Sequence, residues 1–274
     1  MDEPAFDVLR RLCDRKSDGV RPAALLVLAH PGDESLGAAT LLPALGGSPL
    51  VYVTDGAGPG AGEAQAHGCP DRESYAARRR GELISALDSI GIPRSRIHHV
   101  DLVAHEAPRF LVPLTLWIEI LLREQRPSIV LTHPYDGTDA DRDATAFAVH
   151  RACGRVRDAG FKCPVVAEFA LTNAANEARF VGMPDATAVF TRQLTPAEAT
   201  LKRRLLGCFA TYRASLPHYS LRTECFRVAP AYDFTQVPAA PGRDPAIHTD
   251  VSEEWEERAR HALEELSHAG PSFQ

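Results

Sequence analysis

The sequence predicts an α/β domain with a Rossmann-like, mainly parallel sheet that carries helices on both faces. Two observations predict this class. Short apolar runs alternate with helical patterns along most of the chain, and this alternation is typical of parallel sheets covered on both faces. The 274 residues, 45% of them hydrophobic, are also enough to bury one large core. We therefore expect one domain over residues 1–274, with its core at about 23–237.

These patterns predict five strands and five helices between residues 24 and 213. The runs that predict buried strands are 24–29, 50–54, 97–100, 128–132 and 164–171. The patterns that predict helices are 36–45, 72–90, 113–125, 142–158 and 196–213. Gly91 ends the second helix and the Arg126-Pro127 pair ends the third, whereas Thr195 and Pro196 suit the first positions of the fifth.

The chain beyond residue 214 has a weaker pattern. Residues 214–250 are rich in Pro, Tyr and Phe and show no sustained period, so we expect them to wrap the surface. Residues 251–268 form an amphipathic pattern and predict a C-terminal helix that docks on the domain.

Charge and composition exclude several classes of partner. A net charge of -6 provides no basic field for nucleic acid or for an anionic membrane. No apolar stretch approaches the roughly 20 residues that span a bilayer, and the acidic N-terminus is unlike a signal peptide. We therefore expect a cytoplasmic protein of unknown oligomeric state. Its six scattered cysteines, without a C-x-x-C pair, are expected to be reduced thiols.

Polar residues gather in two loops, each directly after a predicted strand. The first loop is AHPGDES (29–35), and the second is THPYDGTDADRDATAFAVH (132–150). Because the carboxyl ends of parallel strands meet at one edge, the two loops should lie close together. The acids of the second loop call for a cation, either a metal or an arginine. The alternative is a solvated acidic loop at a helix N-terminus, which the first loop makes less favourable.

The two loops resemble a known family. AHPGDES resembles the A-H-P-D-D-E motif of the LmbE-like, or PIG-L-type, zinc-dependent de-N-acetylases. HPYDGTDADRDATAFAVH resembles that family's H-P-Y-E-G-G-H-P-D-H-D-A-T-A-F-A-V-H, and VYVTDGAGPG and YAARRRGELISAL resemble two further segments. The resemblance covers about residues 23–237. It implies a Rossmann-like fold, one zinc ion, and hydrolysis of the acetamide of an N-acetyl amino sugar by zinc-activated water.

Three residues match the family's zinc site. His30 and Asp33 match the first two zinc ligands, and Asp141 matches the aspartate of H-P-D-H that the resemblance gives an orienting role. They are the family residues that this site retains.

Three other functional positions differ. Gly32 stands where the family has its general base, Arg142 where it has the third zinc ligand, and Asp139 where it has an oxyanion-stabilising histidine. Glycine cannot take a proton, and arginine offers no lone pair to a metal. An aspartate would repel the charge that a neighbouring donor must stabilise. The substitutions predict that zinc is absent or weakly bound.

We expect the guanidinium of Arg142 to occupy the place of the zinc and to pair with Asp33, Asp141 or Asp139, so that the pocket is charge-balanced without metal. The alternative is a rearranged zinc site in which another residue replaces the lost histidine. The candidates are His133, His67 and Cys69, and their spacing does not favour any of them.

Two further side chains are expected near the pocket. Asp55 closes the second strand and matches a pocket position of the family, although Asp-Gly is also an ordinary turn. Arg79 matches the family's helix arginine, and a plain i,i+3 pair with Glu82 is the alternative.

Two functions follow from the sequence. The first is a pseudoenzyme that retains the de-N-acetylase fold and binds a small molecule, such as an amino sugar, without hydrolysis. The second is an active amide hydrolase with an altered metal site.

Overall fold

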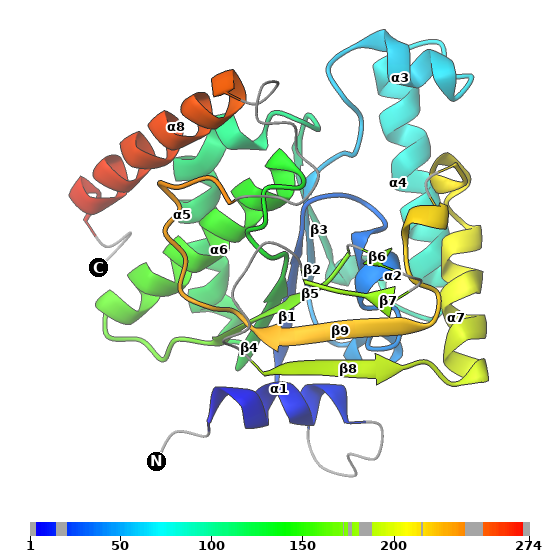
Figure 1. The fold of residues 1–274 in the computed structure, drawn as a ribbon, viewed down its shortest axis with the longest axis horizontal. Helices are drawn as coiled ribbons and strands as arrows, with labels where there is room; N and C mark the ends of the chain where they lie inside the picture. The colour runs from blue at the N-terminus through cyan, green and yellow to red at the C-terminus, as the bar shows by residue number, and fades with distance from the viewer. Residues whose placement is uncertain are drawn as a thin grey trace.

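The computed structural model describes residues 4–14, 21–171, 173–174, 177–180, 188–214, 216–238 and 249–270. Within these ranges a seven-stranded sheet has the order β3-β2-β1-β4-β5-β9-β8 (Figure 1). Its strands are β1 (Ala24–Leu28), β2 (Leu50–Thr54), β3 (Ile97–Leu102), β4 (Ile129–Thr132), β5 (Val165–Phe169), β8 (Val189–Gln193) and β9 (Thr223–Val228). Strands β6 (Asn173–Ala174) and β7 (Glu177–Ala178) form a separate pair.

The parallel part of the sheet confirms the predicted fold class. Strands β1 to β5 pair in parallel with their neighbours, as the five apolar runs predict. Strand β9 pairs antiparallel with both β5 and β8, and neither β8 nor β9 was predicted. The prediction that 214–250 only wraps the surface is therefore wrong for Thr223–Val228. This strand buries the charged side chains of Glu224 and Arg227, so it lacks the apolar signature of a buried strand.

Eight helices accompany the sheet in the described ranges. They are α1 (Ala5–Cys13), α2 (Asp33–Gly37), α3 (Ala61–Ala66), α4 (Arg72–Asp88), α5 (Leu111–Gln125), α6 (Ala140–Asp158), α7 (Pro196–Gly207) and α8 (Thr249–His268). Short 3-10 turns span Leu42–Leu45, Arg94–Arg96, Ala107–Phe110, Ala210–Tyr212 and Leu216–His218.

Two predicted helices need correction. The helix expected at 36–45 is split into α2, which starts earlier, and a 3-10 turn that contains Pro43. The helix expected at 196–213 ends at Gly207, and a 3-10 turn follows it. Its start is as predicted: Thr195 is the N-cap, Pro196 is the first helical residue, and Glu198 completes a capping box with Thr195.

The sheet separates two hydrophobic cores (Figure 1). Leu26 and Leu28 of β1 pack on the face covered by α1, α4 and α7, whereas Leu25 and Val27 pack on the face of α5, α6 and α8. Every residue of β1 is therefore buried, and the loop that follows it starts from a fixed position.

Helix α8 is held on α5 and α6 by both apolar and polar contacts. Trp255 is 7% exposed and donates its indole N–H to the carbonyl oxygen of Phe234 at 3.0 Å. At the other end, the guanidinium of Arg155 in α6 donates to the carbonyl oxygens of Leu266, Ala269 and Gly270. These bonds satisfy carbonyls that the end of a helix leaves without partners.

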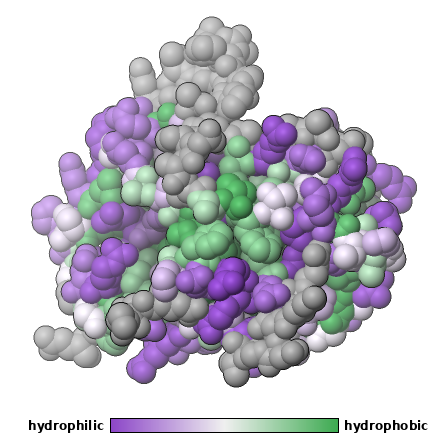
Figure 2. Space-filling model, turned by 60° about the horizontal axis from the view of Figure 1, so that its bottom comes forward, coloured by the Kyte–Doolittle hydropathy of each residue, from purple (hydrophilic) through white to green (hydrophobic). Residues whose placement is uncertain are grey.

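The lower face in Figure 1, formed by α1 and the edge strand β8, comes forward in Figure 2. Apolar side chains gather in the middle of this face and polar side chains surround them. In the ranges described, no helix has both the length and the apolar character needed to cross a membrane. All six cysteines are free thiols, as expected.

Candidate functional site

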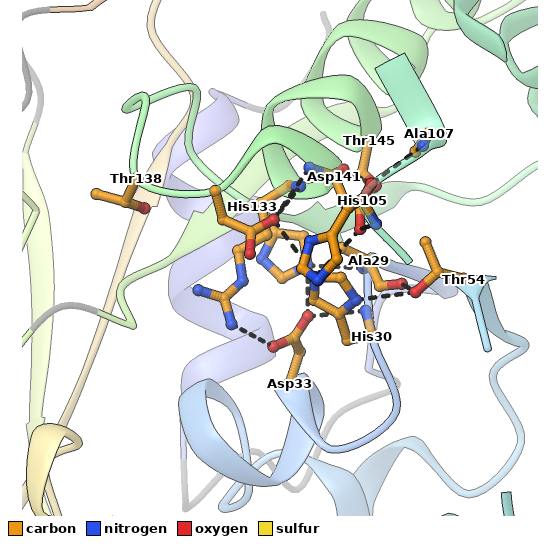
Figure 3. Close-up of polar contacts among 12 residues, drawn as sticks. Ala29, His30, Asp33, Thr54, His105, Ala107, His133, Thr138, Asp141 and Thr145 are labelled. Atoms are coloured by element: carbon orange, nitrogen blue, oxygen red, sulfur yellow. Dashed lines mark hydrogen bonds and ion pairs between the residues drawn. The ribbon is translucent and has the colours of Figure 1, made fainter. Parts of the chain in front are cut away.

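The two polar loops meet above the junction of β1 and β4. These strands are neighbours in the sheet, but the chain leaves β1 toward β2 and leaves β4 toward β5. The connections therefore diverge at the carboxyl ends of β1 and β4, and we use the word crevice for this place, which is where open α/β sheets bind ligands. Figure 3 shows His30, Asp33, His133 and Asp141 converging there.

His30 is held in one orientation by the strand beside it. Its Nδ1 lies 2.8 Å from Oγ1 of Thr54, and that hydroxyl donates to the carbonyl oxygen of Ala29 at 2.9 Å. Since the hydroxyl has one proton, the ring must donate from Nδ1, which directs Nε2 into the crevice. Burial opposes the charged ring, but the nearby Asp139 carboxylate outweighs it and raises the pKa of His30.

Arg142 forms an ion pair with Asp33. Its Nη2 donates to Oδ1 of Asp33 at 2.8 Å, and the Asp33 side chain is fully buried. Burial opposes charge on both groups, yet their attraction prevails: the pKa of Asp33 is lowered and that of Arg142 is raised. Asp33 is thus the carboxylate that the guanidinium of Arg142 contacts by a hydrogen bond, whereas Asp139 accepts the backbone N–H of Arg142.

Gly32 has a backbone conformation that other residues rarely adopt, with φ at 101°. A Cβ built on Gly32 would overlap the ring of Tyr212 and would approach the ring of Phe209 to 3.2 Å. The space of a side chain at this position is therefore filled by an aromatic ring from the turn after α7.

Arg79 fixes this aromatic ring against the first loop. Its guanidinium donates to the Tyr212 hydroxyl at 2.7 Å, to Oγ1 of Thr211 at 2.9 Å and to the carbonyl oxygen of Pro31 at 2.9 Å. The Tyr212 hydroxyl donates to the same Pro31 oxygen at 2.8 Å. Glu82 accepts the Thr211 backbone N–H rather than pairing with Arg79. Arg79 thus supports the loop.

Asp139 and Asp141 lie at the start of α6. Oδ1 of Asp139 caps the helix by accepting the backbone N–H groups of Asp141 and Arg142, both at 3.0 Å. It also lies 3.3 Å from Nε2 of His30. Asp141 accepts the backbone N–H groups of His105 and Ala107, and Oδ2 of Asp141 lies 3.7 Å from Nε2 of His30. Burial raises the pKa of Asp141.

One group among the described residues has metal-ligating atoms within 4.8 Å of one another, and it consists of His30, Asp139 and Asp141. This set differs from the family positions that the resemblance assigns to zinc. Two carboxylates, Asp33 and Asp139, act on the Arg142 guanidinium, and a third, Asp141, lies near His30. A proton on His30, or a cation among the three side chains, would reduce the excess of negative charge.

His133 is fully buried and faces the backbone. Its Nε2 accepts the N–H of Ala29 at 2.9 Å and lies 3.3 Å from Oδ2 of Asp33. Burial lowers the pKa of His133 to about 3, so the ring is neutral. Its position fixes the start of the first loop.

The contacts of Asp55, His67 and Cys69 are with residues other than His30, Asp33 and Arg142. Asp55 accepts both terminal nitrogens of Arg72, at 2.8 and 2.7 Å, and the backbone N–H of Ala57. His67 stacks on Tyr75, and Cys69 packs in a small cluster with the same residue. Their contacts are those of structural side chains.

The family zinc position does not fit a zinc ion in this chain. Arg142 occupies the place of the third ligand, lacks a lone pair and already pairs with Asp33. The ring of Tyr212 fills the place of the base. A three-ligand site with an open position for water is therefore not formed by His30, Asp33 and residue 142.

Sequence reasoning missed two parts of the site. Thr54 orients His30, and its place at the end of a strand beside β1 is a signal that could have found it. Tyr212 reaches Gly32 from 180 residues away in the chain, and nothing local to 210–212 indicates that contact.

The comparisons with known proteins agree with this fold. Residues 25–153 match the family model of GlcNAc-PI de-N-acetylase, PIG-L. No curated protein matches the sequence significantly.

Solved structures with similar folds include enzymes of more than one activity. The A40926 pseudoaglycone deacetylase Dbv21 is 20% identical, with a TM-score of 0.58 over 78% of this chain and 99% of its own. The N,N′-diacetylchitobiose deacetylase of Pyrococcus horikoshii is 15% identical, with a TM-score of 0.50 over 84% and 94%. The 4-carboxy-2-hydroxymuconate hydratase GalB of Pseudomonas putida KT2440 is 16% identical, with a TM-score of 0.53 over 77% and 98%. At these identities the likeness concerns the fold.

Proposed function

This chain carries a PIG-L (LmbE-like) de-N-acetylase family domain over residues 25–153, and on that premise we propose that it is a pseudoenzyme that binds a small molecule in the family crevice without zinc-dependent hydrolysis. The observation that carries the proposal is the buried ion pair between Arg142 and Asp33. It places a fixed organic cation where the family's chemistry needs a metal ligand.

The position of the base supports the same function. A zinc ion would supply an activated water, and a carboxylate would have to take its proton. Gly32 offers no such group, and the buried Tyr212 ring leaves no room for one. The pKa of Tyr212 is raised by burial, so its hydroxyl is not a base at neutral pH.

The crevice supports binding of a polar, uncharged ligand. The side chains of Asp139 and Arg142 are 25% and 15% exposed, so their carboxylate and guanidinium can accept and donate hydrogen bonds with a ligand. Hydroxyl and amide groups use both kinds of partner, and an N-acetyl amino sugar presents both. We infer this ligand class also from the amino-sugar deacetylase among the structural neighbours.

The test combines binding with turnover. The purified chain is titrated with N-acetylglucosamine and N,N′-diacetylchitobiose, with EDTA and then with added zinc, and acetate is assayed in parallel. We expect affinity that is independent of zinc and no acetate release. Acetate release that requires zinc would contradict the proposal, and absence of binding to either sugar would contradict the ligand class.

A second candidate function is an amide hydrolase with a displaced metal. The grouping of His30, Asp139 and Asp141, with Nε2 of His30 directed toward both carboxylates, favours it. Asp139→Asn separates the two functions, because asparagine still caps α6 but removes the charge. Metal-dependent acetate release that Asp139→Asn abolishes and Asp33→Asn retains would establish the displaced site.

A further inference from the structure

Two thiols meet at the end of α6 that lies away from the crevice. Cys153 is 13 residues beyond the start of α6, about 20 Å along the helix at 1.5 Å per residue, and is 2% exposed. Cys163 lies between α6 and β5 and is half-buried. Its sulfur is 3.5 Å from the carbonyl oxygen of Cys153 and 3.4 Å from that of Pro164, so the two cysteines are in direct contact.

An arginine completes the cluster. Nη2 of Arg157, one turn beyond Cys153 on α6, donates to Sγ of Cys163 at 3.5 Å. The neighbouring Cys153 side chain and the Arg157 guanidinium lower the pKa of Cys163 to about 6 against the opposing effect of burial. The same thiol contact and burial raise the pKa of Cys153. The Arg157 guanidinium thus favours the thiolate form of Cys163, whereas burial favours the thiol form of Cys153. A nucleophilic thiolate beside a second thiol is the arrangement that forms a disulfide after oxidation.

We propose that Cys163 is a hydroperoxide-reactive thiol and that Cys153 resolves its oxidised form as an intramolecular disulfide. The Cys163 thiolate attacks the outer oxygen of a hydroperoxide, the O–O bond breaks, and the departing alkoxide takes a proton from water to leave as an alcohol. Cys163 becomes a sulfenic acid. The Cys153 sulfur then attacks the Cys163 sulfur, the S–O bond breaks, and hydroxide leaves as water with the Cys153 proton. Two thiols and one hydroperoxide thus give one disulfide, one alcohol and one water.

The other cysteines provide controls within the same chain. Cys69 and Cys208 are also half-buried, but among the described residues neither has a hydrogen bond to an arginine side chain or to a second thiol. Cys13 and Cys225 are buried. The geometry around Cys163 is thus not a general property of the half-buried cysteines.

The test begins with the reduced full-length chain at pH 7. Alkylation by limiting iodoacetamide is followed peptide by peptide, and we expect Cys163 to react about five- to tenfold faster than Cys69 and Cys208, since a larger thiolate fraction is partly offset by lower nucleophilicity. One equivalent of hydrogen peroxide is expected to yield a Cys153–Cys163 linked peptide under non-reducing digestion. Alkylation of Cys163 no faster than that of the two controls would overturn the proposal.

Variants test the two roles separately. Cys153→Ser should leave Cys163 as a sulfenic acid that dimedone traps, with no disulfide. Arg157→Gln should slow alkylation of Cys163 severalfold and leave Cys69 and Cys208 unchanged, whereas Arg157→Lys should retain most of the rate. If peroxide gives the wild-type chain no link between Cys153 and Cys163, or links Cys163 to another cysteine, the resolving role is wrong.

Discussion

Gly32 is held at a φ of 101° by the loop after β1, directly beneath the ring of Tyr212. An aspartate there, as in the family motif, would meet both backbone strain and overlap with this ring. Strain in the left-handed region costs about 1–2 kcal/mol, and overpacking typically adds about 1–3 kcal/mol. A general base is therefore missing at position 32 because glycine has no side chain, and the packing of Tyr212 also leaves no space for one.

We expect Gly32→Asp to destabilise the chain by about 2–5 kcal/mol, for these two reasons. The measurement is urea denaturation, with Gly46→Asp as the control, because Gly46 has a helical φ of -58° and open space around it. Tyr212→Ala in the Gly32→Asp background should recover part of the loss by removing the overlap. Equal stability of the two aspartate variants would show that Tyr212 does not occupy this space.

At the scale of elements, α8 completes the face of the sheet that carries the second loop. Tyr135 of that loop donates to the carbonyl oxygen of Gln236 at 3.0 Å and packs on Trp255, with ring centroids 5.6 Å apart. The C-terminal helix is thereby connected to the site through an aromatic cluster.

Trp255→Ala should remove much of this connection. We expect a loss of about 3–5 kcal/mol in the free energy of unfolding, as for other buried tryptophans, because the cavity exposes Tyr135 and Phe234. Glu257→Ala is the matched control, since Glu257 is exposed on the same helix and should change stability by less than about 0.5 kcal/mol. A similarly small effect of both substitutions in thermal or urea unfolding would mean that α8 does not contribute to the core.

The whole molecule should lose stability in acid partly through one histidine. His150 packs against Tyr232 and Phe234, and burial with the nearby Arg151 lowers its pKa to about 4. An unfolded histidine has a pKa of about 6.5, so between these values the unfolded chain binds a proton that the folded chain does not. The contribution of His150 is thus present above pH 6.5 and is lost as the pH falls toward 4.

Comparison with His150→Asn isolates this contribution. Between pH 6.5 and 4 the free energy of unfolding of the wild type should fall by about 2–3 kcal/mol more than that of the variant, because the pKa of His150 differs this much between the folded and unfolded chains. Urea denaturation at half-unit pH intervals measures both. Parallel stability curves over this range would mean that His150 titrates normally in the folded chain.

The sequence predicted the parallel half of the fold well because buried parallel strands are continuous apolar runs, as in Ala24–Leu28 and Ile129–Thr132. It failed for β9, whose buried Glu224 and Arg227 are satisfied by partners elsewhere in the chain, Lys202 and Glu168. In the site, too, features set by local sequence could be predicted and features set by distant contacts could not. The convergence of the two loops could be predicted from topology, but the Tyr212 ring over Gly32 depends on a distant contact that no local pattern encodes.

The zinc content of the dialysed protein shows whether Arg142 occupies the zinc position. The wild type and Arg142→His are incubated with zinc, dialysed against a weak chelator at pH 7.5 and analysed for metal per chain. We expect substoichiometric zinc in the wild type and a gain toward one zinc per chain in Arg142→His, whose new imidazole adds the missing donor to His30 and Asp33. One tightly held zinc in the wild type, lost on His30→Ala, would show that Arg142 does not occupy the zinc position.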